Sequence, residues 1–221
     1  MATPVDRRLV LAGIGAGAVT LSVGAIEARA QEVQLGDQLD LDNFMNPGPL
    51  PEMAVGKEDA PVTMVEYASM TCPHCARFHN NVLGELKTKY IDTGKVRFIM
   101  REFPLDRPAT AAFMLARCAG PEKHYALSNA LYRKQEAWAF SGGSPVPPLR
   151  EIAKQAGFTR ESFDKCLKDQ ELLNGILATR KRGQEFGVRG TPSFFLNGRK
   201  YNGSPSLAGL SAAIDSLLKS G

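Results

Sequence analysis

Two cysteines separated by two residues, Cys72-Pro73-His74-Cys75, constrain the fold of this chain more than any other feature. They close the apolar run 62–67 and open a helical pattern, so we expect them at a strand-to-helix junction. Proline suits the first turn of a helix, because its missing N–H would be unpaired there anyway. Cys72 then becomes the helix-capping residue, and the helix dipole with the free amides of the first turn lowers the pKa of its thiol. Cys75, one turn further on, is placed to attack a mixed disulfide formed at Cys72, which predicts thiol–disulfide exchange.

A zinc site and a purely structural disulfide are the other uses of such a cysteine pair. Zinc needs about four ligands, usually with a second pair of cysteines or histidines. The remaining cysteines, Cys118 and Cys166, are single and far apart in the sequence. A disulfide that only rigidifies the chain gains nothing from a Pro-His spacer at a helix cap. We therefore expect Cys72 to be a nucleophile, and the sequence implies no metal and no organic cofactor.

The first 30 residues have the pattern of an export signal. Arg7-Arg8 precedes an apolar stretch over 9–26, and residues 28–30 fit a small-x-small cleavage site. The paired arginines favour the Tat route, but Asp6 before them is atypical, so Tat and Sec both remain open, and an uncleaved anchor is a third reading. We expect removal of residues 1–30 and a mature protein in the periplasm, where its four cysteines can form disulfides.

Length and charge bound the remaining possibilities. A chain of 221 residues allows one domain, or one domain with a sizeable insertion. The formal net charge of +4 is small and dispersed, and no basic run is interleaved with aromatic residues. We therefore expect no nucleic acid as a partner.

The strand and helix patterns indicate an α/β domain. A strand, a helix and a second strand follow one another over 62–67, 72–90 and 96–103, so we expect a βαβ unit with parallel strands. Strand signals return at 193–196 and 199–201 on either side of an Asn-Gly turn, before a last helix.

The segment between these two parts shows helical patterns only. His79 and His124 are expected to be solvated helix residues, whereas Trp138 is expected to be a core or hinge aromatic of the helical part. The expected helices lie near 108–119, 121–136, 148–156, 159–168 and 170–186. The expected organisation is a removed signal over 1–30, an arm or short edge strand over 31–56, an α/β domain built from 57–104 and 187–221, and a helical insertion over 105–186.

Two segments of this sequence resemble the DsbA family of bacterial thiol-disulfide oxidoreductases. The first runs from Val65 to Cys75 and ends in the C-P-H-C motif, and the second, from Gly187 to Phe195, carries Gly-Thr-Pro before a strand. With the helical insertion between them, the resemblance covers roughly residues 57–221. It implies an α/β protein with a thioredoxin fold and an inserted all-helical subdomain.

The resemblance also implies roles for residues around the cysteines. The spacer, here Pro73-His74, tunes the redox balance, and Pro-His goes with an oxidising protein; His74 as a merely solvated residue is the alternative. Any interaction that stabilises the Cys72 thiolate stabilises the reduced protein, so the Cys72–Cys75 disulfide is more readily transferred to a substrate. The resemblance further implies a cis peptide bond before Pro192, which leaves the backbone of Thr191 free to pair with an extended substrate.

Glu66 interrupts an otherwise apolar strand. It is either a charge at a strand edge or, as the resemblance implies, a buried carboxylate beneath the disulfide that passes protons to and from Cys75.

Cys118 and Cys166 both lie in helical patterns of the insertion. They form either two buried free thiols or one structural disulfide, and an oxidising compartment favours the disulfide. In the chain-entropy model that crosslink would stabilise the protein by about 4 kcal/mol.

Together these expectations describe a monomeric periplasmic dithiol-disulfide oxidase that acts on unfolded, newly exported proteins with free thiols. The resemblance implies that a membrane quinone-linked partner reoxidises the pair. One alternative is an isomerase or reductase on the same scaffold, kept reduced by another membrane partner, which Thr191 favours because threonine also occurs there in isomerase-type relatives. The other is a binding module or holdase that uses the same groove without exchange chemistry.

Overall fold

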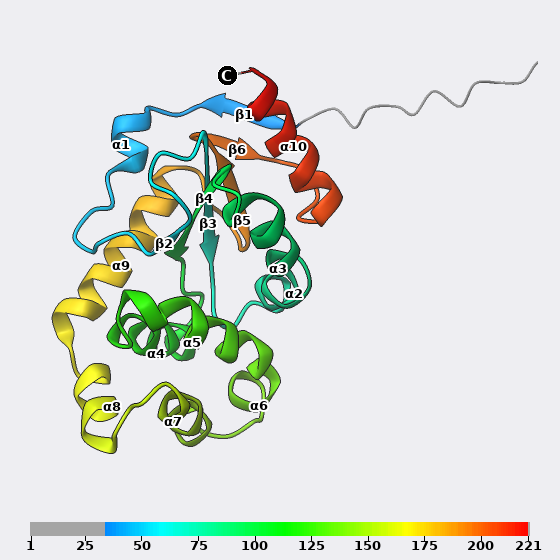
Figure 1. The fold of residues 1–221 in the computed structure, drawn as a ribbon. Helices are drawn as coiled ribbons and strands as arrows, with labels where there is room; N and C mark the ends of the chain where they lie inside the picture. The colour runs from blue at the N-terminus through cyan, green and yellow to red at the C-terminus, as the bar shows by residue number, and fades with distance from the viewer. Residues whose placement is uncertain (1–33, 221) are drawn as a thin grey trace, which may run out of the picture. The chain divides into compact units, whose positions relative to one another are not determined.

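A mixed sheet of six strands forms the centre of the computed structural model, which describes residues 34–220 (Figure 1). The expected export signal, residues 1–30, lies outside this described part. The strand order is β1-β6-β5-β3-β4-β2; β3 and β4 run parallel, as the βαβ pattern predicts, and β3 pairs antiparallel with β5. The predicted α/β fold class is therefore confirmed. The strands are β1 (Leu35–Gln38), β2 (Ala54–Val55), β3 (Val62–Ala68), β4 (Val96–Glu102), β5 (Ser193–Leu196) and β6 (Arg199–Tyr201).

The segment before β3 adds a strand to each edge of the sheet. β1 pairs antiparallel with β6, and β2 pairs antiparallel with β4. Between them lies the short helix α1 (Leu41–Met45), which Asp40 caps by accepting hydrogen bonds from the amides of Asp42 and Asn43. The predicted arm or short edge strand is thus two short strands and a helix.

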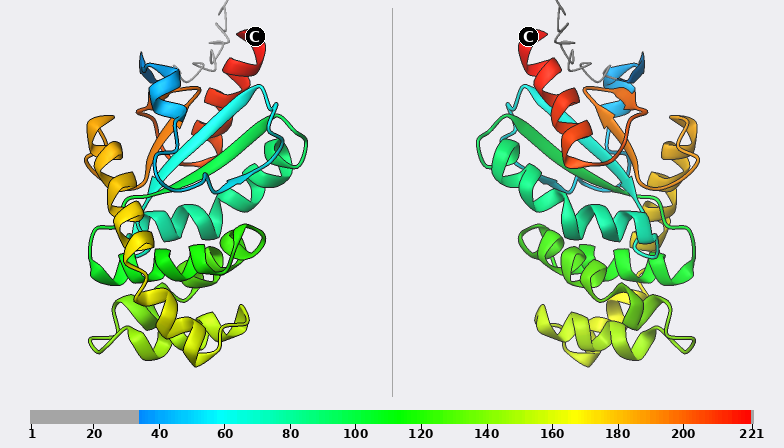
Figure 2. Two further views of the ribbon diagram at one scale, coloured as in Figure 1. Left: turned by 90° about the vertical axis from the view of Figure 1, so that its left-hand side faces the viewer. Right: turned by 90° about the vertical axis from the view of Figure 1, so that its right-hand side faces the viewer.

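Helices cover both faces of the sheet (Figure 2). Helix α10 (Leu207–Ser220) and the helices that follow β3 pack on one face, in the larger of two apolar clusters. On the other face, Phe44 from α1 contacts Phe195 of β5, with ring centroids 5.0 Å apart, beside helix α9 (Gln170–Glu185). β3 is buried on both faces, which explains its nearly continuous apolar sequence.

The predicted helix over 72–90 is interrupted in the structure. It consists of α2 (Pro73–Asn81), α3 (Leu83–Leu86) and a π-helical turn, η1 (Lys87–Ile91). The break falls at Val82, whose φ of −120° is not helical. Two asparagines and a β-branched valine are weak helix formers, and together they allow the chain to bend there.

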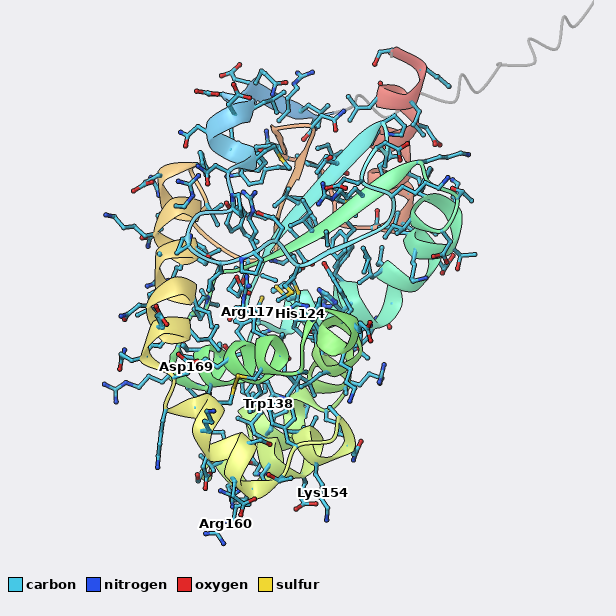
Figure 3. The ribbon with its side chains drawn as sticks, turned by 60° about the vertical axis from the view of Figure 1, so that its left-hand side comes forward. Arg117, His124, Trp138, Lys154, Arg160 and Asp169 are labelled. Atoms are coloured by element: carbon cyan, nitrogen blue, oxygen red, sulfur yellow. A yellow bond between two sulfur atoms is a disulfide. The ribbon has the colours of Figure 1, made fainter. Side chains whose placement is uncertain are left out.

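The helical part contains six helices within the described residues. The predicted helix over 121–136 is two helices, because Lys134 leaves the helical conformation with φ −103°. Trp138 is 1% exposed and donates a hydrogen bond to the carbonyl of Leu131 at 2.8 Å, which confirms the predicted core aromatic (Figure 3). The helices are α4 (Arg107–Cys118), α5 (Pro121–Arg133), α6 (Gln135–Ala139), α7 (Val146–Gln155), α8 (Arg160–Leu167) and α9.

The described residues, 34–220, all belong to one compact unit. The division into an α/β part and a helical insertion therefore remains a proposal about independent folding units. Among the helices of residues 34–220, none has the length and apolar character needed to cross a bilayer.

Candidate active site

Cys72 lies where the chain turns from β3 into α2. It is the N-cap residue of α2, with φ −81° and ψ 119°, and Pro73 occupies the first helical position. The amide of Cys72 donates to the carbonyl of Ser69 at 3.1 Å, and its carbonyl accepts from the amide of Ala76. Both cysteines of the motif are thiols in this structure. Cys72 is 5% exposed and Cys75 is fully buried, so reagents reach only the first sulfur.

The environment of Cys72 lowers the pKa of its thiol to about 5. The largest cause is a hydrogen bond from the Cys75 thiol, followed among the favourable ones by the Thr191 side chain and the backbone amides of Cys75 and His74, while burial opposes the shift. The backbone amides are the smallest of the favourable causes, and the Cys72 side chain forms no regular helix-cap hydrogen bond in the described chain. The thiolate therefore depends more on the second cysteine than the helix-cap argument predicts.

The pKa of the Cys75 thiol is shifted in the opposite direction. Burial raises the pKa of its thiol well above the ordinary value, and the hydrogen bond to Cys72 and the charge of Glu66 raise it further. At neutral pH the pair accordingly holds one thiolate, at Cys72, and one proton, at Cys75.

The loop before β5 meets Cys72 from the other end of the sequence. The Thr191–Pro192 peptide bond is cis. The Cys72 sulfur lies 3.2 Å from the carbonyl oxygen of Thr191, to which it donates a hydrogen bond when it is protonated. Because β5 pairs with β3 in the sheet, these two loops emerge side by side at the same end of the strands.

Two contacts from the helical part hold the cysteine turn, and sequence reasoning missed both. The Gln135 amide in α6 donates to the carbonyls of Met70 and Cys72 at 2.8 and 3.1 Å. The Thr71 hydroxyl donates to Asp106, the residue that caps α4, at 2.8 Å. An Asp before Arg-Pro is a recognisable helix start and could have indicated Asp106, whereas nothing in the local pattern singles out Gln135.

The imidazole of His74 contacts Arg77 and, within residues 34–220, has no hydrogen bond to either cysteine of the motif. Its side chain is exposed, with Nδ1 3.1 Å from a guanidinium nitrogen of Arg77. Its effect on Cys72 comes through the backbone amide, not the imidazole.

Glu66 is fully buried in β3, between β4 and β5, so the interpretation as a charge at a strand edge is wrong. Its Oε2 lies 2.8 Å from Nε2 of His79 in α2, and its Oε1 has no hydrogen-bond partner among the described residues.

The prediction that His79 and His124 are solvated is also wrong, since they are 6% and 0% exposed. His79 follows Cys75 by four residues, so both face the sheet from the same side of α2. His124 in α5 lies near Glu102 and Arg117 (Figure 3), and burial lowers the pKa of its imidazole to about 4.

Cys118 and Cys166 form a disulfide that joins α4 to α8. Cys118 is exposed and Cys166 is buried. The crosslink belongs to the helical part and shares no hydrogen bond with the cysteine turn among the described residues.

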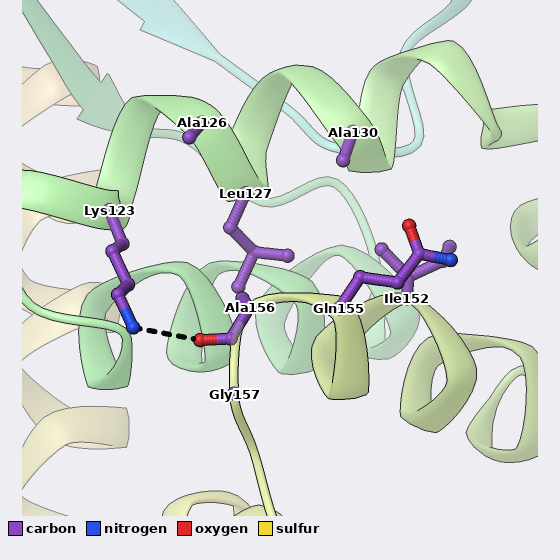
Figure 4. A pocket seen from close by; sticks show the side chains of 8 residues that line it. All are labelled: Lys123, Ala126, Leu127, Ala130, Ile152, Gln155, Ala156 and Gly157. Carbon is purple, nitrogen blue, oxygen red and sulfur yellow. Dashed lines mark hydrogen bonds between the residues drawn. The ribbon is translucent and has the colours of Figure 1, made fainter.

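A cavity inside the helical part is separate from this site. It has a volume of about 380 Å³, lies between α5 and α7 and is lined by Leu127, Ile152 and neighbouring residues; Lys123 Nζ donates to the Ala156 carbonyl at 3.2 Å at its rim (Figure 4). None of its lining residues belongs to the cysteine turn or the Thr191 loop. Over residues 34–220 there is no group of three or more His, Cys, Asp or Glu side chains that could hold a metal ion.

Comparison with known proteins gives the family. The model of a thioredoxin family matches residues 50–216. A Rickettsia bellii protein named as a protein-disulfide oxidoreductase is 36% identical over 76% of this chain, which spans 65% of that relative's length. The crystal structure of Wolbachia pipientis α-DsbA1 is 32% identical, with a TM-score of 0.74 over 80% of this chain and 96% of that one. A protein-disulfide isomerase from Novosphingobium aromaticivorans is 25% identical, with a TM-score of 0.66 over 76% of this chain and 99% of that one. The expected thioredoxin fold is thereby confirmed, and the chain belongs to the DsbA-like thiol-disulfide oxidoreductase family of the thioredoxin superfamily.

Proposed function

We propose that this chain is a protein dithiol-disulfide oxidoreductase that introduces disulfides into other proteins through Cys72 and Cys75. The proposal rests on the opposite pKa shifts of the two thiols. The pKa of Cys72 is about 5, and that of Cys75 is raised well above the ordinary value. The thiolate is the nucleophile, and a thiol of low pKa is also the better leaving group. Cys72 is therefore the sulfur that forms and releases the mixed disulfide.

The oxidising cycle starts from a Cys72–Cys75 disulfide. A substrate thiolate attacks the Cys72 sulfur, the bond to Cys75 breaks, and Cys75 leaves as a thiolate that takes up a proton. A second substrate thiolate attacks the substrate sulfur of the mixed disulfide, and Cys72 leaves as a thiolate. Two electrons pass from the substrate to the cysteine pair. In the reverse direction Cys75 resolves the mixed disulfide.

The stabilised Cys72 thiolate favours an oxidase. It lowers the free energy of the reduced protein relative to the disulfide form, so the disulfide is readily transferred to a substrate. Pro73 supports this by fixing Cys72 at the helix cap, and the His74 amide contributes to the low pKa.

Substrate recognition is assigned to the loop around Thr191 and Pro192. The carbonyl of Thr191 lies within hydrogen-bonding distance of the Cys72 thiol, so an extended substrate that paired with this backbone would present its own sulfur to Cys72.

The cellular setting follows from the sequence signal and the family. We propose that the protein acts in the periplasm as a monomer, after export by the Tat or Sec route. Its substrates are newly exported proteins with free thiols, and a membrane quinone-linked partner accepts the electrons.

A disulfide isomerase or reductase on the same scaffold is the second candidate, favoured by Thr191 and by the similarity to the Novosphingobium isomerase. The equilibrium between the purified protein and a glutathione buffer separates the two. An oxidase retains both thiols even in strongly oxidising mixtures of glutathione, whereas a reductase becomes a disulfide in reducing ones.

A holdase without exchange chemistry is tested by Cys72→Ser. The variant should bind unfolded substrates but form no disulfide in them. Disulfide formation at the wild-type rate would refute the assignment of Cys72.

A further inference from the structure

Glu66 and His79 form a buried pair directly behind the reaction centre. Glu66 Oε2 and His79 Nε2 are 2.8 Å apart, and both side chains have no exposed surface. The proposed cycle requires Cys75 to gain and lose a proton, although it too is fully buried. His79 lies one helical turn after Cys75 on the same side of α2, and the charge of Glu66 raises the pKa of the Cys75 thiol.

The second imidazole nitrogen fixes the protonation pattern of the pair. Nδ1 of His79 lies 3.3 Å from the side-chain oxygen of Asn129 in α5. An amide oxygen has no proton to give, so Nδ1 carries the hydrogen of this bond. Nε2 is then left to share a single proton with Glu66, which lies either on the carboxyl group or on the imidazole.

The neighbouring titratable groups do not compete for this proton between pH 5 and 9. Tyr132 stacks on His79 with ring centroids 4.2 Å apart, and burial raises the pKa of its hydroxyl well above the ordinary value. Burial does the same to the pKa of Tyr125 and lowers the pKa of His124 to about 4. The groups facing the pair are Cys72 and Cys75 from α2 and its cap, and His124, Tyr125 and Tyr132 from α5, with Lys87 and Arg133 at the adjacent surface.

A solvent-reaching cavity lies beside His79, the member of the pair that lines it. It has a volume of about 330 Å³ and lies between α2 and α5, where His79 and Asn129 line it together with the exposed residues Asn80, Lys87 and Arg133. Water in this cavity can therefore reach Asn129, the hydrogen-bond partner of His79, without passing the Cys72 surface.

We infer that His79 is a positioning residue for the proton of Cys75: it orients Glu66, shares one proton with it, and exchanges that proton with water in the cavity between α2 and α5. This inference rests on the proposed exchange function. When the Cys72–Cys75 bond breaks, the Cys75 thiolate takes the shared proton. Water in the cavity beside His79 then restores a proton between Nε2 and Glu66, while Asn129 keeps the other hydrogen on Nδ1. In the reverse direction the pair first releases the shared proton to water. Cys75 then gives its own proton to the vacated site before its sulfur attacks Cys72.

The test is a single-turnover reaction of the oxidised protein with a dithiol peptide, quenched with acid from pH 5 to 9 and corrected for ionisation of the peptide. In His79→Gln the amide can still bond to Glu66 but cannot carry the shared proton. We expect the rate at pH 7 to fall about tenfold, less than the 10²- to 10⁴-fold contribution of a direct acid–base group, and the pH profile to lose one inflection. Asn129→Leu should change the profile in the same way.

His124→Gln is the matched control, because His124 is a buried histidine outside the pair. The pH profile of exchange in His124→Gln should match that of the wild type. The alkylation rate of Cys72 should match the wild type in His79→Gln, Asn129→Leu and His124→Gln alike. A His79→Gln profile that superimposes on the wild type overturns this inference alone. A wild-type protein that does not react with the peptide at any pH refutes the proposed function instead.

If His79→Gln does not fold, ¹⁵N NMR of the imidazole in the wild-type protein decides. Nδ1 of His79 should remain protonated from pH 5 to 9, because it donates to the Asn129 oxygen. An unprotonated Nδ1 would overturn the inference.

Discussion

The Cys72 sulfur and the carbonyl oxygen of Thr191 are 3.2 Å apart, although 119 residues separate them in the sequence. The contact exists because β5 pairs with β3, so that the loop before β5 lies against the turn after β3. The nucleophile and the backbone proposed to hold its substrate are therefore positioned by one sheet.

The first prediction concerns the reactivity of Cys72. The reduced protein should react with iodoacetamide at a rate that reaches half of its maximum near pH 5, because the pKa of Cys72 is lowered to about 5. Only this cysteine should be labelled in the folded protein, since Cys75 is buried and the other two form a disulfide. Cys75→Ala should move the midpoint upward, because it removes the largest cause of the low pKa. A wild-type midpoint near 8 would contradict the assignment.

Much of this arrangement could be predicted from the sequence. The strand before Cys72, the proline at the first helical position and the hydrophobic periodicity of the helices are local signals, and the structure bears them out. The Gly-Thr-Pro segment could be connected to Cys72 only through family resemblance, since no local pattern reports which loops meet in space.

What the sequence could not give are the tertiary contacts of polar side chains. His79 shows the pattern of a surface residue, but its position four residues after Cys75 turns it toward the sheet, where Glu66 is its partner. The contact of Gln135 was unpredictable for the same reason. Glutamine is common on helix surfaces, and only the folded structure brings its amide to the cysteine turn.

The second prediction tests that contact of Gln135. Gln135→Leu leaves the buried carbonyls of Met70 and Cys72 without their donor, and an unpaired buried polar group costs about 1–3 kcal/mol. The free energy of unfolding from urea titration should therefore fall by about 2 kcal/mol. The exposed Gln170 is the matched control, and Gln170→Leu should change it by less than about 0.5 kcal/mol. Equal effects of the two substitutions would show that the bonds of Gln135 contribute nothing specific.

The third prediction separates the two cysteine pairs. Replacing Cys118 and Cys166 together by serine opens a loop that spans 48 residues of sequence separation. In the chain-entropy model this lowers the free energy of unfolding by about 4 kcal/mol. Exchange with a dithiol peptide should persist below the unfolding transition, because the crosslink shares no hydrogen bond with the cysteine turn within residues 34–220. Complete loss of exchange in a folded double variant would instead make this disulfide part of the reaction.

The fourth prediction is an acid sensitivity that originates at His124. Both ring nitrogens of this histidine are buried without a hydrogen-bond partner in the described structure, and burial lowers the pKa of the imidazole from 6.5 to about 4. The unfolded chain therefore binds a proton below pH 6.5 that the folded protein accepts only near pH 4. The stability contribution of the neutral imidazole is fully present above pH 6.5 and is lost as the pH falls toward 4. At 1.36 kcal/mol per pKa unit the loss amounts to about 3 kcal/mol.

His124→Phe removes this titration while preserving a buried ring. Urea titrations of the variant between pH 7 and 4 should lose about 3 kcal/mol less stability than those of the wild type. The exposed His74 provides the comparison, and urea titrations of His74→Gln over the same pH range serve as the control. A buried neutral imidazole must make the free energy of unfolding fall with pH wherever the unfolded state can protonate it. Parallel stability curves for His124→Phe and the wild type would therefore mean that the acid-sensitive group lies elsewhere.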